Sequence, residues 1–442
     1  MKKFFYPLLL MMAMTVTFIS CDDDDVTIPA LSVEVPGLEA DGDVEVATGD
    51  TLVFKAKDIN SPITLLHWYV NGEKVSEGPT YKFVSNKVGE FKVTLKATSV
   101  DGGVAVKEFE VEVYGKYKKG TFVLSEGNFS DQNGKLTFIS PKGVVTDSAY
   151  FKVNGSFLGH STQDLCIEDG KMYIISQDNK LNGDGILVVV NAETLVKEAA
   201  YTQELASLSN PTHVLVEDRL AYIRDNRGVH TFNLDTKELK LVEEGNMAKN
   251  RMAEVEDNIY VISNDHLLSL NNGKVARSIS MGGKISGIVA GDNDVLWVAL
   301  DKKPAEIVKM DGKTGSVLST NVLESEYGLN AGWGATPSIG AKGDTLYFSN
   351  NTTTIYRHIF GQKKTEKMVN TADYIEDAKM LYNNIGVDPE NGDVYMTTIK
   401  GYGNDYKMNN ITVFNFDKQK VPVANYQNHT SFPAGVFFTE SF

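Results

Sequence analysis

A short motif recurs seven times in the last three quarters of the chain, and this recurrence restricts the fold more than any other feature. Each copy is an aromatic residue, then apolar residues, then usually a polar or turn-forming residue. The copies begin at Phe122, Tyr173, Tyr222, Tyr260, Trp297, Tyr347 and Tyr395. Their spacing, between 37 and 51 residues by difference of these positions, leaves room for four strands and their turns. The repeat therefore predicts an all-β ring of seven four-stranded blades, a β-propeller.

The third copy illustrates the strand order that we expect within a blade. An inner strand at 212–216 is followed by strands at 220–224, 229–234 and 239–242, and the third strand ends at the turn Asp235-Thr236. The aromatic motif combined with such Asn or Asp turns resembles YVTN-type seven-bladed propellers. The resemblance covers residues 119–442.

The two ends of this repeat region are complementary. The first copy has no inner strand, because 120–122 leads directly into its second strand. The last segment, 433–438, matches the inner-strand pattern of 211–215. We therefore expect the C-terminal strand to complete the first blade and close the ring, which would remove an open sheet edge.

Residues 29–115 have the pattern of a separate β-domain. Polar and apolar residues alternate strictly over 90–97 and 107–113, and Asn71-Gly72 supplies a hairpin turn. About seven such strands predict an immunoglobulin-like sandwich. The stretch resembles a PKD domain in its Trp68 strand, its Asn-Gly turn and the run Gly89–Leu95 followed by Asp101-Gly102. We expect Trp68 to fill the core and the domain to act as a spacer.

The N-terminus has the pattern of a lipoprotein leader. Two lysines precede an apolar run at 4–19 that fits the core of a signal peptide, predicted to span 1–20. Phe18-Ile19-Ser20-Cys21 resembles a lipobox, which implies lipidation of Cys21. An acidic tether follows at 21–28, and its four aspartates resemble a surface-export signal. We expect an outer-membrane lipoprotein facing the cell exterior and held only by its lipid anchor; an ordinary cleaved signal and retention at the inner membrane are the alternatives.

Charge and motif content exclude several classes of function. The net charge of −15 argues against nucleic acid as a partner. Gly-x-Ser-x-Gly, His-Glu-x-x-His and phosphate-loop motifs are missing, so we predict no enzyme, no cofactor and no metal. Two sets of residues could still support a metal site or catalysis. The ring could bring His160 and His429 together. The carboxylates Glu126 and Asp178 could act in hydrolysis or as hydrogen-bond acceptors.

The candidate binding residues lie on the face of the ring where propellers bind ligands. The loops between blades and those joining second to third strands form this face, and both are rich in aromatic and amide side chains, which suit a binding surface. We expect about half of these rings to be structural, and the glycine-flanked Trp333 and Tyr402 to be exposed. The predicted ligand-binding residues are Phe129, Phe157, His160, Arg227, Tyr327, Trp333, Tyr374, Tyr402, Tyr406, Tyr426 and Phe432.

These features together predict a capture protein. The chain resembles surface lipoprotein propellers that capture corrinoids, which implies vitamin B12 as ligand and a TonB-dependent outer-membrane transporter as partner. A surface glycan-binding protein is the first alternative. A lactonase-like or lyase enzyme and an adhesive or structural surface protein are the others.

Overall fold

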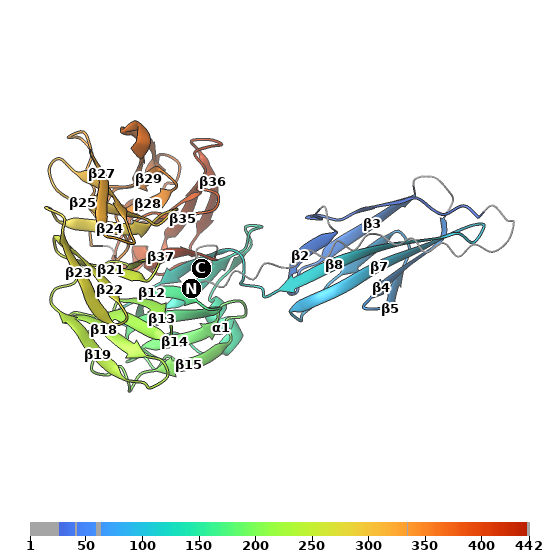
Figure 1. The fold of residues 1–442 in the computed structure, drawn as a ribbon, viewed down its shortest axis with the longest axis horizontal. Helices are drawn as coiled ribbons and strands as arrows, with labels where there is room; N and C mark the ends of the chain where they lie inside the picture. The colour runs from blue at the N-terminus through green and yellow to red at the C-terminus, as the bar shows by residue number, and fades with distance from the viewer. Residues whose placement is uncertain (1–25, 40–41, 59–62, 334, 440–442) are drawn as a thin grey trace. The chain divides into compact units, whose positions relative to one another are not determined.

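The computed structural model describes residues 26–39, 42–58, 63–333 and 335–439. The chain divides into two compact units between Tyr114 and Gly115 (Figure 1). The predicted signal peptide, Cys21 and the four aspartates lie outside the described residues. In the part of the chain that is described, no helix combines the length and the apolar character needed to span a bilayer.

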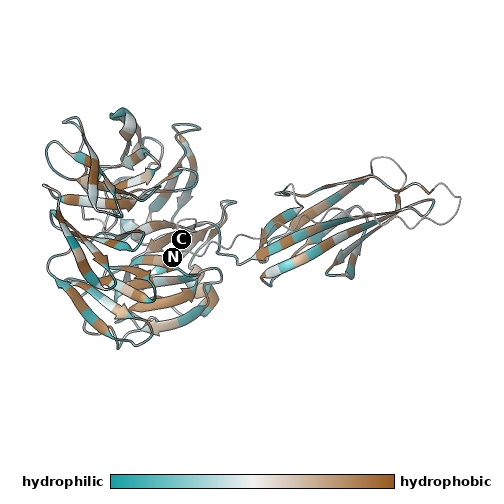
Figure 2. Cartoon of the chain, in the orientation of Figure 1, coloured by the Kyte–Doolittle hydropathy of each residue, from teal (hydrophilic) through white to brown (hydrophobic). Residues whose placement is uncertain are grey.

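The first unit is a sandwich of two sheets. One sheet has the order β1 (Leu31–Glu34), β3 (Leu52–Asp58), β6 (Thr80–Phe83), and the other has the order β2 (Asp43–Ala47), β8 (Val104–Tyr114), β7 (Gly89–Ser99), β4 (Ile63–Val70), β5 (Glu73–Glu77). The predicted hairpin is the β4–β5 pair. Its turn residues Asn71 and Gly72 have φ values of 50° and 84°, which a tight hairpin turn of this type requires. The alternation of apolar and polar residues along the long strands is visible in Figure 2.

Trp68 lies at the centre of the sandwich core, as predicted. Its side chain is fully buried and contacts the rings of Phe54 and Tyr81 at centroid distances of 5.6 and 5.7 Å. The indole N–H donates to the carbonyl of Gly78 at 2.9 Å, so that burial leaves the ring nitrogen satisfied.

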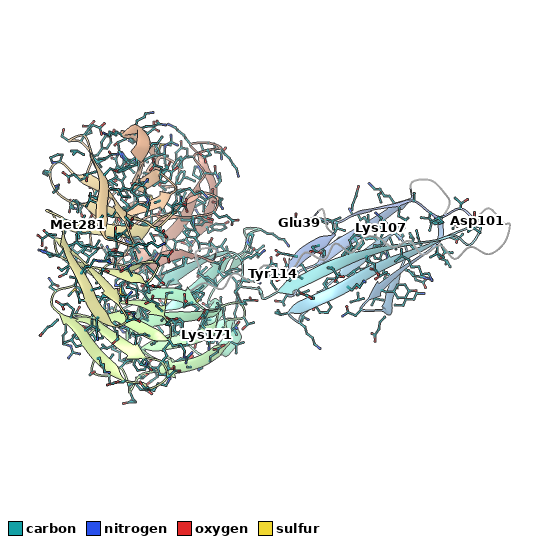
Figure 3. All side chains as sticks on the ribbon, viewed as in Figure 1. Glu39, Asp101, Lys107, Tyr114, Lys171 and Met281 are labelled. Carbon is teal, nitrogen blue, oxygen red and sulfur yellow. The ribbon has the colours of Figure 1, made fainter. Side chains whose placement is uncertain are left out.

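The chain enters and leaves the first unit at opposite ends. The Asp101 carboxylate, in the turn between β7 and β8, accepts a hydrogen bond from the Thr27 backbone N–H at 2.8 Å. Figure 3 shows Asp101 at the end of the unit away from Tyr114, the last residue of β8. Thr27 and Tyr114 therefore lie at opposite ends of this unit.

The second unit contains seven successive sheets, which we call blades, each with four main strands. The first two blades are β37 (Pro433–Phe438), β9 (Thr121–Ser125), β10 (Lys135–Ile139), β11 (Val145–Thr146); and β12 (His160–Glu168), β13 (Lys171–Asp178), β14 (Leu187–Asn191), β15 (Lys197–Tyr201). The third and fourth are β16 (His213–Glu217), β17 (Leu220–Arg224), β18 (Gly228–Asn233), β19 (Leu239–Glu244); and β20 (Ala253–Val255), β21 (Asn258–Ser263), β22 (His266–Asn271), β23 (Lys274–Ser280).

The last three blades follow the same order. They are β24 (Ile285–Ala290), β25 (Val295–Leu300), β26 (Glu306–Asp311), β27 (Ser316–Val322); then β28 (Ile339–Lys342), β29 (Thr345–Phe348), β30 (Thr354–Ile359), β31 (Lys364–Asn370); and finally β32 (Met380–Leu381) with β33 (Gly386–Val387), β34 (Val394–Ile399), β35 (Asn409–Phe414), β36 (Pro422–Gln427). The short helices are α1 (Ala149–Asn154), η1 (Phe360–Gln362), η2 (Thr371–Asp373) and η3 (Gly403–Lys407). The inner strands meet around the ring: β12 contacts β37 and β16, and β33 contacts β28 and β37.

The C-terminal strand closes the ring, as predicted. β37 pairs antiparallel with β9, with Phe437 opposite Phe122 and Pro433 opposite Ser125. The first blade is therefore assembled from the two ends of the unit.

The repeated aromatic residue explains how the blades are joined. All seven copies lie in the second strand of their blade and are buried. The hydroxyl of Tyr222 accepts a hydrogen bond from the Gly273 backbone N–H at 2.8 Å, and that of Tyr260 donates to the Gly312 carbonyl at 2.5 Å. Both partners belong to the turn between third and fourth strands of the next blade. The motif recurs because each junction between blades needs a large side chain that reaches across it.

Candidate functional site

A cavity of about 1110 Å³ opens among the loops of the first and seventh blades. Its lining comes from the two kinds of loop that form the predicted face: the second-to-third strand loops at 126–132 and 402–407, and the inter-blade segments at 147–148 and 428–432, with Ser161, Gln177 and Tyr382. Four predicted site residues, Phe129, Tyr402, Tyr406 and Phe432, line this one cavity.

One side of the cavity is a cluster of four rings, which we call the aromatic wall: Tyr382, Tyr402, Tyr406 and Phe432. Phe432 is its centre and lies 4.5 Å from Tyr406 in a stacked arrangement, 5.0 Å from Tyr382 and 6.3 Å from Tyr402. Tyr406 is buried, whereas 64% of Tyr402 is exposed. The wall thus has a fixed base and an exposed outer ring that a ligand can contact.

Phe129 supplies a further ring at the cavity. It is 73% exposed, and the Lys180 ammonium lies 4.3 Å from its ring centroid. Its backbone carbonyl lies 3.0 Å from Nε2 of the buried His160. The loop that carries Phe129 is therefore held from beneath while its ring faces outward.

A partly buried carboxyl, that of Glu126, lies next to the aromatic wall. The hydroxyl of Tyr382 donates to its Oε2 at 3.2 Å. Burial raises the pKa of Glu126 above its ordinary value, and the nearby Lys249 opposes this shift. Burial in turn lowers the pKa of Lys249, because both groups lose hydration. The site thus combines aromatic surface with a carboxyl of low solvation.

A buried asparagine fixes the loop that carries Phe432. Asn409, in β35, donates from Nδ2 to the Thr430 carbonyl at 2.8 Å and accepts at Oδ1 from the Thr430 backbone N–H at 3.1 Å. The Ser431 backbone N–H donates to Ser125 Oγ at 3.2 Å. These bonds hold Phe432 at a φ of 55°, a conformation that is costly for a residue with a side chain. The wall is therefore preorganised by the protein.

Five of the predicted residues lie elsewhere and do not line this cavity. Phe157 stacks on Phe151 at 4.5 Å, Arg227 donates to the carbonyl of Ser207 in the segment before the third blade, and Tyr327 packs edge-on against Tyr356 at 5.6 Å. Trp333 is 98% exposed and Tyr374 is 47% exposed, so the exposure expected for Trp333 and Tyr402 is confirmed. A single ligand in the cavity would not meet these five.

Two of the predicted positions were assigned to the wrong element. Tyr426 lies in strand β36, where it is partly buried against Tyr395 and neighbouring apolar residues, because the polar pattern before it hides a fourth strand. His160 begins β12 and is fully buried, since the inner strand starts earlier than its apolar residues suggest. It supports the loop of Phe129 and is not itself accessible.

The two histidines considered as a pair have different carboxylate partners. Nδ1 of His160 lies 3.0 Å from Asp178, and Nδ1 of His429 lies 2.8 Å from Asp147. Across the described ranges, no group of three or more histidine, cysteine, aspartate and glutamate side chains is arranged to hold a metal ion.

Three polar side chains at or beside the cavity are not among the predicted ligand-binding residues: Glu126, Gln163 and Asn409. Glu126 and Tyr382 belong to the predicted face, and their loop positions were the available signal. Gln163 and Asn409 lie in strands, where a polar residue in an apolar run was the only indication.

The architecture and the cavity define a class of protein, a PKD domain followed by a β-propeller with a loop-lined cavity. Residues 37–111 match the PKD domain. Residues 119–439 match the family described as "Domain of unknown function (DUF5074)", and the chain belongs to this family.

The chain is similar to several solved structures. A quinoprotein alcohol dehydrogenase-like protein from Bacteroides thetaiotaomicron is similar with a TM-score of 0.57 and 14% identity, covering 93% of this chain and 99% of that chain. BamB from Moraxella catarrhalis gives a TM-score of 0.40 and 10% identity over 71% of this chain and 84% of that chain. The first likeness, at this identity, concerns the fold alone and carries no catalytic inference. No curated protein matches the sequence.

Proposed function

We propose that this protein binds a nutrient molecule in the cavity between its first and seventh blades and does not transform it. The observation that carries the proposal is the preorganised aromatic wall beside the partly buried Glu126 in a single cavity of about 1110 Å³. Aromatic surface with a few convergent polar groups is the usual composition of a small-molecule site.

The best candidate for the ligand is a corrinoid such as vitamin B12. The cavity lies at or above the roughly 1,000 Å³ upper range of sites for drug-sized ligands, which favours a large molecule. A corrinoid combines a flat macrocycle with peripheral amides. The exposed ring of Tyr402 would contact the edge of the macrocycle, and Asn128 and Glu126 would meet its amides.

The cellular setting is part of the same proposal. Lipidation of Cys21 would anchor the chain in the outer membrane, facing the exterior. The PKD-like unit, which the chain enters and leaves at opposite ends, would hold the cavity away from the lipid. From there the ligand would pass to a TonB-dependent transporter.

Isothermal titration with cyanocobalamin tests the ligand directly, using the chain from Val26 onward, which contains both compact units. We expect tight one-to-one binding. Absence of heat at millimolar ligand would reject the corrinoid.

Cys21→Ala expressed in the native cell type tests the anchor: the variant should leave the membrane fraction, whereas retention there would reject lipid anchoring at Cys21.

A surface glycan-binding role is the second candidate, and the exposure of Tyr402 favours it. A sugar ring could stack on this side chain while Asn404 and Lys407, which line the same rim, hydrogen-bond its hydroxyls. Weak binding on a glycan array that Tyr402→Ala abolishes, together with no response to cyanocobalamin, would support this alternative.

A further inference from the structure

Beside the cavity lies a glutamine whose amide makes no well-formed hydrogen bond to any residue that the structure describes. Gln163, in β12, is 2% exposed, and within the described ranges neither its Oε1 nor its Nε2 has a hydrogen-bond partner. Its neighbours in the strand are paired: Thr162 Oγ1 lies 2.9 Å from Ser176 Oγ, and Asp164 accepts from Arg251 at 3.2 Å. Buried amides are rarely left unpaired, because the loss of hydration is then uncompensated.

The backbone directs this side chain out of the regular pairing of the sheet. The register between β12 and β13 shifts between Thr162 and Asp164, so Gln163 has no residue opposite it. Bulges of this kind commonly re-aim a side chain next to a binding site. Gln163 is among the side chains that lower the pKa of the Glu126 carboxyl, against the effect of burial, so the two side chains are neighbours although their atoms do not meet the distance and angle of a hydrogen bond.

Glu126 connects this amide to the cavity. Glu126 lines the cavity, and so does Ser161, which lies two positions before Gln163 on the same strand. On its other side, Glu126 accepts the hydrogen bond from Tyr382 of the aromatic wall. An acceptor and an unpaired amide are thus brought together where the cavity meets the wall.

We infer that Glu126 and Gln163 form a specificity subsite for an uncharged polar group of the ligand, one that both donates and accepts a hydrogen bond. A primary carboxamide or a hydroxyl has this chemistry. The donor of this polar group would hydrogen-bond to the Glu126 carboxylate, and its acceptor would accept from the Gln163 amide. The rest of the ligand would contact the aromatic wall. The inference rests on ligand capture at this cavity but not on the ligand being a corrinoid.

The first experiment measures stability without any ligand. Gln163→Leu removes an amide that the protein does not pair, so its Tm should equal or exceed that of the wild type. The matched control is Asn321→Leu, which removes an amide with 3% exposure that donates to His358 at 2.9 Å and to the Phe360 carbonyl at 2.8 Å. The control should lose roughly 2 °C or more in Tm.

The second experiment uses nicotinamide, which joins a flat ring to a primary carboxamide, in ligand-observed NMR. Nicotinamide should bind the wild type and bind Gln163→Leu about tenfold more weakly, the loss expected when one polar contact of a buried site is removed. N,N-dimethylnicotinamide, which cannot donate, should bind poorly. Binding of 3-pyridinemethanol as well would extend the subsite to hydroxyls, and its failure would restrict the subsite to carboxamides.

The outcomes separate this inference from the proposed ligand. A fall in Tm for Gln163→Leu as large as that of Asn321→Leu would make the amide structural and overturn the subsite, as would absent or unchanged nicotinamide binding. If Gln163→Leu keeps its Tm and weakens nicotinamide binding, but cyanocobalamin does not bind, the corrinoid is rejected as ligand and the subsite is supported. If cyanocobalamin binds wild type and Gln163→Leu equally, the corrinoid stands and the subsite is rejected.

Discussion

Phe432 stacks on Tyr406 with the ring centroids 4.5 Å apart and the planes 12° from parallel. Phe432 immediately precedes the strand that closes the ring, and Tyr406 lies in a loop of the seventh blade. One contact therefore joins the closure of the fold to the wall of the cavity, and changes at either end should affect both.

Removal of residues 433–442 should destabilise the whole second unit. The deletion takes away β37 and its buried Val436, Phe437 and Phe438, and burial of three such side chains contributes at least about 5 kcal/mol. Thermal unfolding by circular dichroism would measure the loss. Truncation after Thr439, which keeps β37 whole, is the control, and an unchanged Tm for the longer deletion would disprove closure by this strand.

Tyr402→Ala should weaken ligand binding about tenfold while the free energy of unfolding changes by less than about 0.5 kcal/mol, because the ring is exposed. Trp333→Ala is the matched control, since Trp333 is also exposed but does not line the cavity. Titration of both variants with cyanocobalamin compares them. Equal losses would mean that the ligand covers a wider face than the cavity.

Trp68→Ala should unfold the first unit selectively. Removal of a fully buried tryptophan costs about 3–5 kcal/mol, and the first unit has its own core. Differential scanning calorimetry should show one transition shifted to lower temperature and a second that is unchanged. Leu65→Ala, at a half-exposed position on the same strand, should leave both transitions in place; a shift of both transitions in Trp68→Ala would show that the units unfold together.

Glu126→Gln should change how stability depends on pH. Burial raises the folded-state pKa of Glu126 above the ordinary 4.5, so the folded chain holds this proton more tightly than the unfolded chain. Stability from this group is therefore full below pH 4.5 and is lost as pH rises through the folded-state pKa. The variant cannot ionise, so its Tm minus that of the wild type should grow between about pH 4 and pH 7. A constant difference would contradict the raised pKa.

The repeat made the architecture predictable, whereas the site depended on contacts that a linear pattern does not contain. The seven aromatic positions could be assigned because each occupies the same place in a blade and joins it to the next, as Tyr222 and Tyr260 do. The pairing of β37 with β9 followed from a missing strand at one end and an extra one at the other.

The errors have the same physical origin. Tyr426 lies in an outer strand, where solvent on one side weakens the apolar pattern, and it was taken for a loop residue. His160 is polar but buried, because the Phe129 carbonyl and Asp178 satisfy its ring nitrogens. The approach of Gln163 to Glu126 needs both a bulge in β12 and the packing of the second blade on the first, and neither is visible in the order of residues.

The assembly of the first blade from both ends has a consequence for the biogenesis of the protein. A chain synthesised from its N-terminus supplies Glu126 and Phe129 early, whereas Phe432 and β37 follow only after the strands of the other blades. Until β37 pairs with β9, the seventh and first blades are not joined and the cavity between their loops is incomplete. Binding of any ligand in this cavity should therefore report that β37 has folded into the first blade.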